Sequence, residues 1–207
     1  EERKKLLQEA SRVFNLGRDT GFQKSCTDEY LDLISEQERL RSAYNANDIA
    51  PENSSVSSTL FRVVCFAASR PREAHRILNE AEKLARKFRV PDKRFWHIRV
   101  RAFAASGQWA NLKNLADSRT KPPIGVKHFA LAAIKGKQSV GEIMRYIEKV
   151  ANPEERYDLF CEAKLWKRAV DEAKKLGDPR RIMHVRSLSN SSEIHSLCDE
   201  WAVKFGI

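Results

Sequence analysis

The sequence lacks the patterns of a membrane span and of a β-sheet. No stretch approaches the roughly 18 consecutive apolar residues that a bilayer-spanning helix needs. Any membrane association is therefore expected to come through partners. No segment alternates apolar and polar residues at a period of two, so we expect no sheet. With 42% apolar and 32% charged residues, the 207-residue chain has the composition of an ordinary globular protein.

Motifs of catalysis and of metal or nucleotide binding are also absent. There is no His-Glu-x-x-His, no Gly-x-Gly-x-x-Gly and no Cys-x-x-Cys sequence, and Gly136 and Gly141 do not form a phosphate loop. We therefore expect no catalytic residue, no metal and no cofactor, and an enzyme is the least favoured class. The cysteines lie far apart, which predicts buried free thiols in a reducing compartment. They are Cys26, Cys65, Cys161 and Cys198.

Apolar residues recur with a helical period along most of the chain. Between residues 74 and 88, for example, Ile77, Ala81, Leu84 and Phe88 share one face of a predicted helix. The pattern predicts an all-α protein. The expected helices lie near residues 2–16, 27–45, 56–69, 71–88, 92–106, 108–118, 125–135, 139–150, 153–164, 166–176, 179–188 and 191–205.

Residues that begin or end helices occur where the periodic pattern changes. Ser139 opens a capping box, and Asn152 and Asp178 each precede a proline that can occupy the first helical position. Gly107 and Gly177 occur where a helix would end in a left-handed residue. These signals support the expected boundaries.

The connections after residue 69 are short, which predicts antiparallel helical hairpins. A weak internal repeat supports stacking of these hairpins. In it, a first group of apolar residues is matched 57 residues later by Phe160, Trp166, Ala169 and Ala173. The first group is Phe103, Trp109, Leu112 and Ala116. We therefore predict one α-solenoid domain of stacked antiparallel hairpins over residues 1–207, with a flexible connector at 45–58. A compact helical bundle is the alternative.

Positive charge is concentrated in the middle of the chain. The net charge is +10, and residues 60–103 carry 12 basic and 4 acidic side chains. Residues 104–138 add 6 basic and 1 acidic side chain, whereas residues 139–207 are balanced at 12 each. Such a segment indicates an acidic protein surface, nucleic acid or anionic lipid as the partner.

The most basic stretch spans residues 86–101 and reads as a helix end, a proline connection and a new helix that Asp92 could cap. Its basic side chains are expected to be exposed at one end of the hairpin, either as a solvated rim or as a patch that binds carboxylates. They are Arg86, Lys87, Arg89, Lys93 and Arg94. Trp96 lies in the same stretch, where it serves either core packing or recognition.

Three segments carry a resemblance to a known family. The run Phe88-Arg-Val-Pro-Asp-Lys-Arg-Phe-Trp96, the pair Trp109 and Leu112, and Pro123-Ile-Gly125 resemble the C-terminal region of the vacuolar protein sorting protein sixteen family. The resemblance is densest from about residue 72 to 135. It implies an α-solenoid within a shared core subunit of the HOPS and CORVET tethering complexes. The implied location is cytoplasmic, peripheral on the late endosome, vacuole or lysosome membrane.

The resemblance also implies a partner and a site. In this family the region binds the Sec/Munc-type (SM) subunit, vacuolar protein sorting protein thirty-three, alongside other tethering subunits. Transferred to matching positions, the protein-binding residues are Arg89, Lys93, Arg94 and Trp96, while the family's second aromatic is His97 here. The alternative is a basic helical nucleic-acid-binding domain. We expect no specific nucleic acid, since no known reading motif is present.

Overall fold

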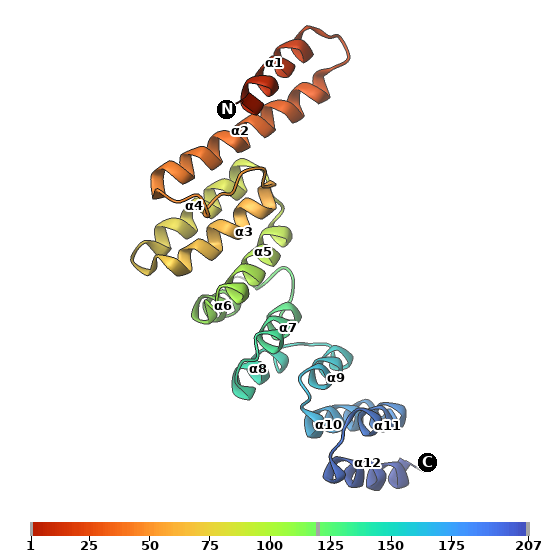
Figure 1. The fold of residues 1–207 in the computed structure, drawn as a ribbon. Helices are drawn as coiled ribbons and strands as arrows, with labels where there is room; N and C mark the ends of the chain where they lie inside the picture. Colours follow the sequence, from red (N-terminus) through yellow and green to blue (C-terminus); the bar gives the residue numbers. More distant parts are fainter. Residues whose placement is uncertain (1, 119–120, 206–207) are drawn as a thin grey trace. The chain divides into compact units, whose positions relative to one another are not determined.

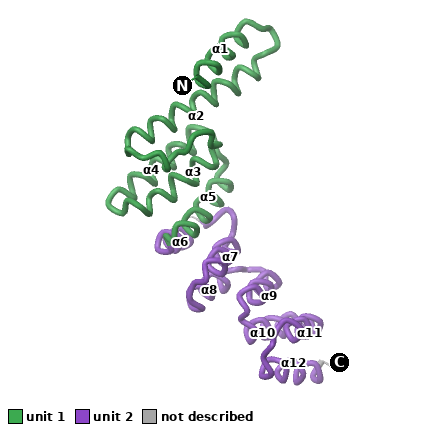
Figure 2. The backbone as a smooth tube through the Cα atoms, in the orientation of Figure 1, with its two compact units in different colours: residues 1–108 green, residues 109–207 purple. Residues whose placement is uncertain are grey.

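A computed structural model describes residues 2–118 and 121–205 of the chain. Within these ranges there are twelve α-helices, two short 3₁₀-helices and no strand (Figure 1). The all-α prediction is therefore confirmed. Two compact units divide the chain, residues 1–108 and residues 109–207 (Figure 2). The single-domain organisation over 1–207 stays a prediction.

The first unit is built from hairpins of neighbouring helices. Helix α1 packs along α2, and α3 packs against both α4 and α5. The elements are α1 (Glu2–Leu16), α2 (Gly21–Tyr44), α3 (Val56–Phe66), η1 (Ala67–Ser69), η2 (Pro71–Glu73), α4 (Ala74–Lys87) and α5 (Asp92–Ala105). Their core is formed by fully buried side chains that include Leu60, Val63, Ile77 and Ala102.

Two boundaries in this unit differ from the sequence prediction. Helix α2 begins at Gly21, ahead of the expected residue 27, and the hydroxyl of Thr20 closes the preceding turn by donating to the Phe14 carbonyl at 2.5 Å. The predicted helices 56–69 and 71–88 each contain a 3₁₀ segment, on either side of Arg70. Arg70 lies outside the helical region because a proline follows it.

The segment between α2 and α3 is held against α2 by hydrogen bonds. Ile49 and Ala50 are fully buried, and a guanidinium nitrogen of Arg41 donates to the Ala50 carbonyl at 2.6 Å. The amide of Gln37 donates to the Ser54 carbonyl at 2.8 Å. The flexibility expected for residues 45–58 stays a prediction.

In the second unit the helices from α7 to α12 pack against their sequence neighbours. Contacts join α7 with α8, α9 with α10, α10 with α11 and α11 with α12, and further contacts join α7 with α9 and α10 with α12. Packing onto the next helix and the next but one is the pattern of a helical solenoid. The helices are α6 (Trp109–Ala116), α7 (Lys127–Lys135), α8 (Val140–Ile147), α9 (Pro153–Glu162), α10 (Trp166–Leu176), α11 (Pro179–Leu188) and α12 (Ser192–Phe205).

The helix caps predicted at Ser139, Asn152 and Asp178 are present. The Ser139 hydroxyl accepts a hydrogen bond from the backbone of the capping-box glutamate at 3.3 Å. Asn152 and Asp178 each accept from the backbone two residues ahead, at 2.9 and 3.0 Å. Gly107 and Gly177 adopt φ of 70° and 64° just after their helices, as predicted.

Candidate protein-docking surface on the first unit

The turn between α4 and α5 has an arginine where glycine is usual. The backbone N–H of Val90 donates to the Ala85 carbonyl at 2.9 Å, and that of Arg89 donates to the Arg86 carbonyl at 3.1 Å. These two bonds close α4 in a Schellman motif, with Arg89 left-handed at φ 49°. A residue with a Cβ pays about 1–2 kcal/mol for this conformation. The local fold therefore gains no stability from an arginine at this position.

Five basic side chains around this turn are exposed, and we call them the basic turn. They are Arg86, Lys87, Arg89, Lys93 and Arg94. Arg86 is paired with Glu82 on α4 at 3.3 Å, and Lys87 is paired with Glu36 on α2 at 2.9 Å. The other three form no ion pair with any residue that the structure describes. These three cations are therefore available to a partner.

The start of α5 corrects one expectation. The helix begins at Asp92 itself, and the preceding Pro91 has no side chain that can cap it. Asp92 is therefore not the cap; it lies in the first turn, where the helix dipole favours a carboxylate. Arg94, two residues later, is a cation near the same positive helix end. The helix dipole therefore does not favour a positive charge at Arg94.

Lys87 differs from the other basic-turn residues because it belongs to a structural network. Glu36 accepts hydrogen bonds from Lys87 at 2.9 Å and from Arg39 at 2.8 Å, and Arg39 also reaches Glu80 on α4 at 2.5 Å. Partial burial acts to raise the pKa of Glu36 and of Glu80. Hydrogen bonds from the cations outweigh burial and hold both pKa values below the ordinary 4.5. Lys87 thus helps to fasten α4 to α2.

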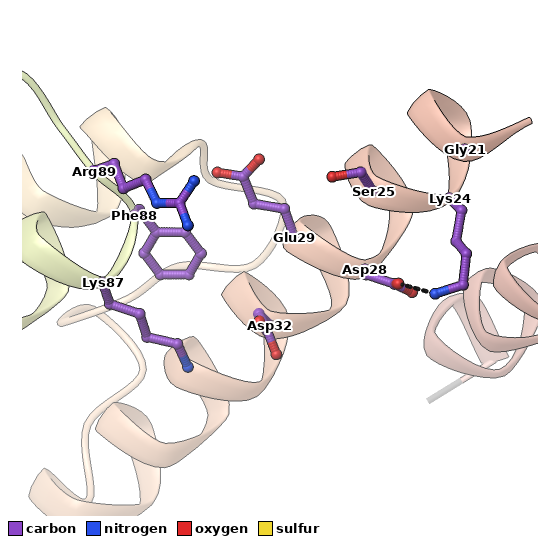
Figure 3. Close-up of a pocket in the computed structure, with 9 residues that line it drawn as sticks. All are labelled: Gly21, Lys24, Ser25, Asp28, Glu29, Asp32, Lys87, Phe88 and Arg89. Carbon is purple, nitrogen blue, oxygen red and sulfur yellow. Dashed lines mark hydrogen bonds and ion pairs between the residues drawn. The ribbon is translucent and has the colours of Figure 1, made fainter.

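A groove of about 470 Å³ lies between α2 and the end of α4, and we call it the α2 groove. Three carboxylates of α2 line it, Asp28, Glu29 and Asp32, facing Lys87 and Arg89. Figure 3 shows the Arg89 guanidinium directed toward Glu29 across this space. Because both signs of charge line the groove, it selects no single ligand chemistry.

A second groove of about 240 Å³, the α5 groove, lies on the other side of the turn. Arg89 and Trp96 both line it, so the structure brings these two predicted site residues together. Trp96 is only 9% exposed, and its ring forms part of a wall. Lys93 and Arg94 are exposed and do not line this groove.

Arg99 is a further residue of the α5 groove that sequence reasoning missed. Its guanidinium carbon lies 4.6 Å from the centre of the Trp96 ring and 4.8 Å from that of Phe95. Both distances are within the range of cation–π contact. Its spacing was the available signal, because residues three and four apart on a helix share a face. The α5 groove therefore reaches about one helical turn beyond Trp96, the last of the predicted site residues.

The described part of the chain has free cysteines that are buried at Cys198, half-buried at Cys65 and Cys161 and exposed at Cys26, so the expectation of buried thiols is wrong for Cys26. Its histidines, cysteines and carboxylates form no cluster able to hold a metal ion. Burial raises the pKa of the thiols of Cys65, Cys161 and Cys198, which keeps them protonated at neutral pH. None of the described helices combines the length and apolarity that crossing a bilayer requires.

Comparison with known proteins identifies the family. The model of the family "Vps16, C-terminal region" matches residues 1–199. The vacuolar protein sorting-associated protein 16 homolog of Drosophila melanogaster is 29% identical over 126 residues, which are 59% of this chain and 15% of that protein. Protein VACUOLELESS1 of Arabidopsis thaliana is 24% identical over 179 residues, 86% of this chain and 19% of that protein.

A third relative extends over most of the chain. The probable vacuolar protein sorting-associated protein 16 homolog of Schizosaccharomyces pombe is 22% identical over 202 residues, 94% of this chain and 22% of that protein. The chain therefore spans 15–22% of the length of these three relatives. Since the family model covers nearly all of the sequence, the resemblance is confirmed, and this chain belongs to the family of the Vps16 C-terminal region.

Proposed function

We propose that this chain is a non-enzymatic helical adaptor that docks an SM protein, vacuolar protein sorting protein thirty-three, within an endolysosomal HOPS or CORVET tethering complex. Docking would bring the SM protein to sites of SNARE assembly and membrane fusion at the late endosome, vacuole or lysosome. The chain would act on the cytoplasmic side, reaching the membrane through other tethering subunits. Its relatives are named for vacuolar protein sorting, which supports this role.

The observation that carries the proposal is the set of unpaired cations at the basic turn. Arg89, Lys93 and Arg94 are exposed and have no ion pair among the described residues. Arg89 is in a left-handed conformation and Arg94 is near a positive helix end, so neither serves local stability. Guanidinium groups bind carboxylates through two parallel hydrogen bonds. We therefore assign these cations to an acidic surface of the SM protein.

The test is the calorimetric affinity of the chain for the purified SM subunit, measured with wild type and Arg94→Glu. The substitution removes a donor and adds repulsion. Loss of a buried, paired charge costs roughly 2–5 kcal/mol, or about 30-fold to several thousand-fold in affinity. Stability should change by no more than about 0.5 kcal/mol, because the new acidic group suits the helix start.

Arg180→Glu in the second unit is the matched control. Arg180 is exposed and follows a proline in the first turn of α11, much as Arg94 follows one in the first turn of α5. It should leave the affinity unchanged. Lys87→Glu is unsuitable, since it would also break the pair with Glu36. Equal affinities for wild type and Arg94→Glu would remove Arg94 from the interface, and a collapsed melting temperature would make it structural.

Nucleic acid is the second candidate partner, favoured by the 12 basic side chains of residues 60–103. A salt titration against duplex and single-stranded DNA separates the two proposals. An adaptor should bind weakly, without sequence preference, and lose its binding as salt rises. Tight, sequence-dependent binding that Arg94→Glu abolishes would favour the nucleic-acid function.

A further inference from the structure

Arg99 combines three features that its neighbours do not share. It lies over the rings of Phe95 and Trp96, it lines the α5 groove, and its Nε–H is buried without a hydrogen-bond acceptor. Among the described residues, this Nε is the single buried side-chain nitrogen or oxygen that has no hydrogen-bond partner. Buried polar groups in folded proteins are nearly always paired, so an orphaned donor needs an explanation.

The surroundings keep Arg99 charged but give it no bonded partner. Burial lowers the pKa of Arg99, while the charges of Glu82 and Asp92 act to raise it. A guanidinium stays protonated in proteins even so. Neither carboxylate forms an ion pair with Arg99, and Glu82 is already paired with Arg86 at 3.3 Å. The free protein therefore holds a charged guanidinium whose Nε–H has no hydrogen-bond acceptor.

The α5 groove beside Arg99 has room for an acidic side chain. Its volume is about 240 Å³. At about 30 Å³ for each molecule of liquid water, that is space for several waters, which a carboxylate could displace. Arg86 and Arg89 also line the groove, so three guanidinium groups face one opening against two carboxylates. The charge of the lining favours an anionic group.

We propose that Arg99 is a stored binding residue that takes an aspartate or glutamate side chain of the protein partner. On docking, the guanidinium leaves the two aromatic rings and turns its Nε and Nη edge toward the carboxylate in a two-bond pair, beside Arg89. The partner thereby satisfies the orphaned Nε–H, and the ring contacts hold the side chain ready. This inference rests on the proposed docking of the SM subunit, and it adds the chemistry recognised and a residue outside the predicted site.

The main experiment measures the affinity of the full chain for the SM subunit with three substitutions. Arg99→Met keeps apolar cover on the rings and removes the orphaned donor. It should leave the melting temperature unchanged or raised, while lowering affinity at least about tenfold, as the loss of a paired charge does. Arg99→Lys should lower affinity similarly, because an ammonium cannot form the planar fork.

Arg76→Met is the matched control. Arg76 also covers an aromatic ring in this unit, with its guanidinium carbon 5.0 Å from the centre of the Tyr44 ring. Its Nε, however, is already paired with the Tyr44 hydroxyl at 3.3 Å. Its removal should not change the affinity. If Arg99→Met binds as wild type does, while Arg94→Glu weakens binding, the inference is overturned and the proposed function stands.

A second measurement tests the α5 groove without the SM subunit. The Trp96 indole N–H signal is followed by NMR during titration with N-acetylglutamate, with N-acetylglutamine as the uncharged control. Withdrawal of Arg99 from the ring should shift this signal with the acid and not with the amide, and Arg99→Met should abolish the response. Equal responses to the two compounds would overturn the inference. Failure of wild type to bind the SM subunit, with this response intact, would instead refute the proposed function.

Discussion

Two arginines, one in each unit, show opposite uses of a partly buried guanidinium. In the second unit, Arg156 donates to Glu172 at 2.8 and 2.5 Å and to the carbonyls of Val150 and Ala151 at 2.8 and 3.0 Å. In the first unit, Arg99 lies over two rings with its Nε–H unpaired. Arg156 therefore joins α9 and α10 through four hydrogen bonds, whereas the Nε–H of Arg99 has no acceptor.

The two segments also differ in how their charges are balanced. Residues 139–207 carry equal numbers of basic and acidic side chains. Arg181, for example, has carboxylates of Asp178, Glu154 and Asp158 within 3.1 to 3.9 Å. In the basic turn, three of five cations have no such partner among the described residues. Net charge therefore marks a candidate interface only where the folded chain leaves the charges unpaired.

The largest expected effect comes from removing the carboxylate that is paired with Arg156. Glu172→Ala should lower the free energy of unfolding by about 3–5 kcal/mol, because it leaves the Arg156 charge partly buried without its carboxylate. Urea unfolding followed by circular dichroism measures this loss. Glu193→Ala is the control: its pair with Lys167 at 2.6 Å is largely exposed, so the loss should stay under about 1 kcal/mol. Equal losses in the two variants would refute the structural role of Arg156.

The units also cover a tryptophan differently, which gives the second prediction. Trp96 lies under Arg99, whereas the ring of Trp109 packs directly over Gly136, where a Cβ would overlap it. Gly136→Ala should therefore cost about 1–3 kcal/mol through overpacking. Gly141→Ala is the matched control, since a Cβ there meets nothing within 4 Å. A Gly136→Ala variant as stable as wild type would show that Trp109 can move away freely.

The third prediction separates the effect of a left-handed side-chain-bearing residue on stability from its effect on SM binding. Arg89 and Lys164 are both left-handed, at φ 49° and 57°, and both follow a helix closed by a Schellman motif. Replacing either by glycine should raise stability by about 0.5–1 kcal/mol, because glycine relieves the strain but frees the unfolded chain. Only Arg89→Gly should also weaken SM binding. Loss of binding in both variants, or in neither, would end the distinction between these two turns.

These turns also show where sequence reasoning succeeds and fails. The left-handed residues at Gly107 and Gly177 were predicted, because glycine is the usual residue there. The same conformation at Arg89, Lys137 and Lys164 was not predicted, because arginine and lysine have no preference for it. Helix existence follows from the apolar period, while such turn geometry requires the folded chain.

The candidate site was predicted in part for a related reason. Exposure of the five basic-turn residues follows from charge and helical period. Trp96 is mostly buried and lies under the Arg99 guanidinium. Both features depend on how α5 packs, which the local amino-acid sequence does not specify. Likewise, the pairing of Lys87 with Glu36 joins residues 51 positions apart. Sequence spacing alone therefore does not distinguish Lys87 from Arg89, although only Lys87 has an ion pair.

The smallest expected effect concerns pH and the network that fastens α4 to α2. The pKa values of Glu36 and Glu80 are lowered by Arg39 with Lys87 and Lys83 respectively, despite the opposing effect of burial. Below their ordinary pKa of 4.5, the unfolded chain binds protons that the folded chain still excludes. The stabilisation is therefore complete above about pH 4.5 and is lost as pH falls through the lowered values. Because the pairs are partly exposed, each should contribute about 1 kcal/mol or less.

Urea unfolding at a series of pH values, with wild type and Glu36→Gln, measures this contribution. The stability difference between the two proteins should be constant near neutral pH and shrink below about pH 4.5, since the protonated glutamate then resembles glutamine. In an Arg39→Met background the difference should already be smaller at neutral pH, because Arg39 donates to both carboxylates. A difference that persists unchanged in acid would show that the Glu36 pKa is not lowered. Lys87 would then be as available to a partner as Arg89, and the proposed difference between these two residues would be refuted.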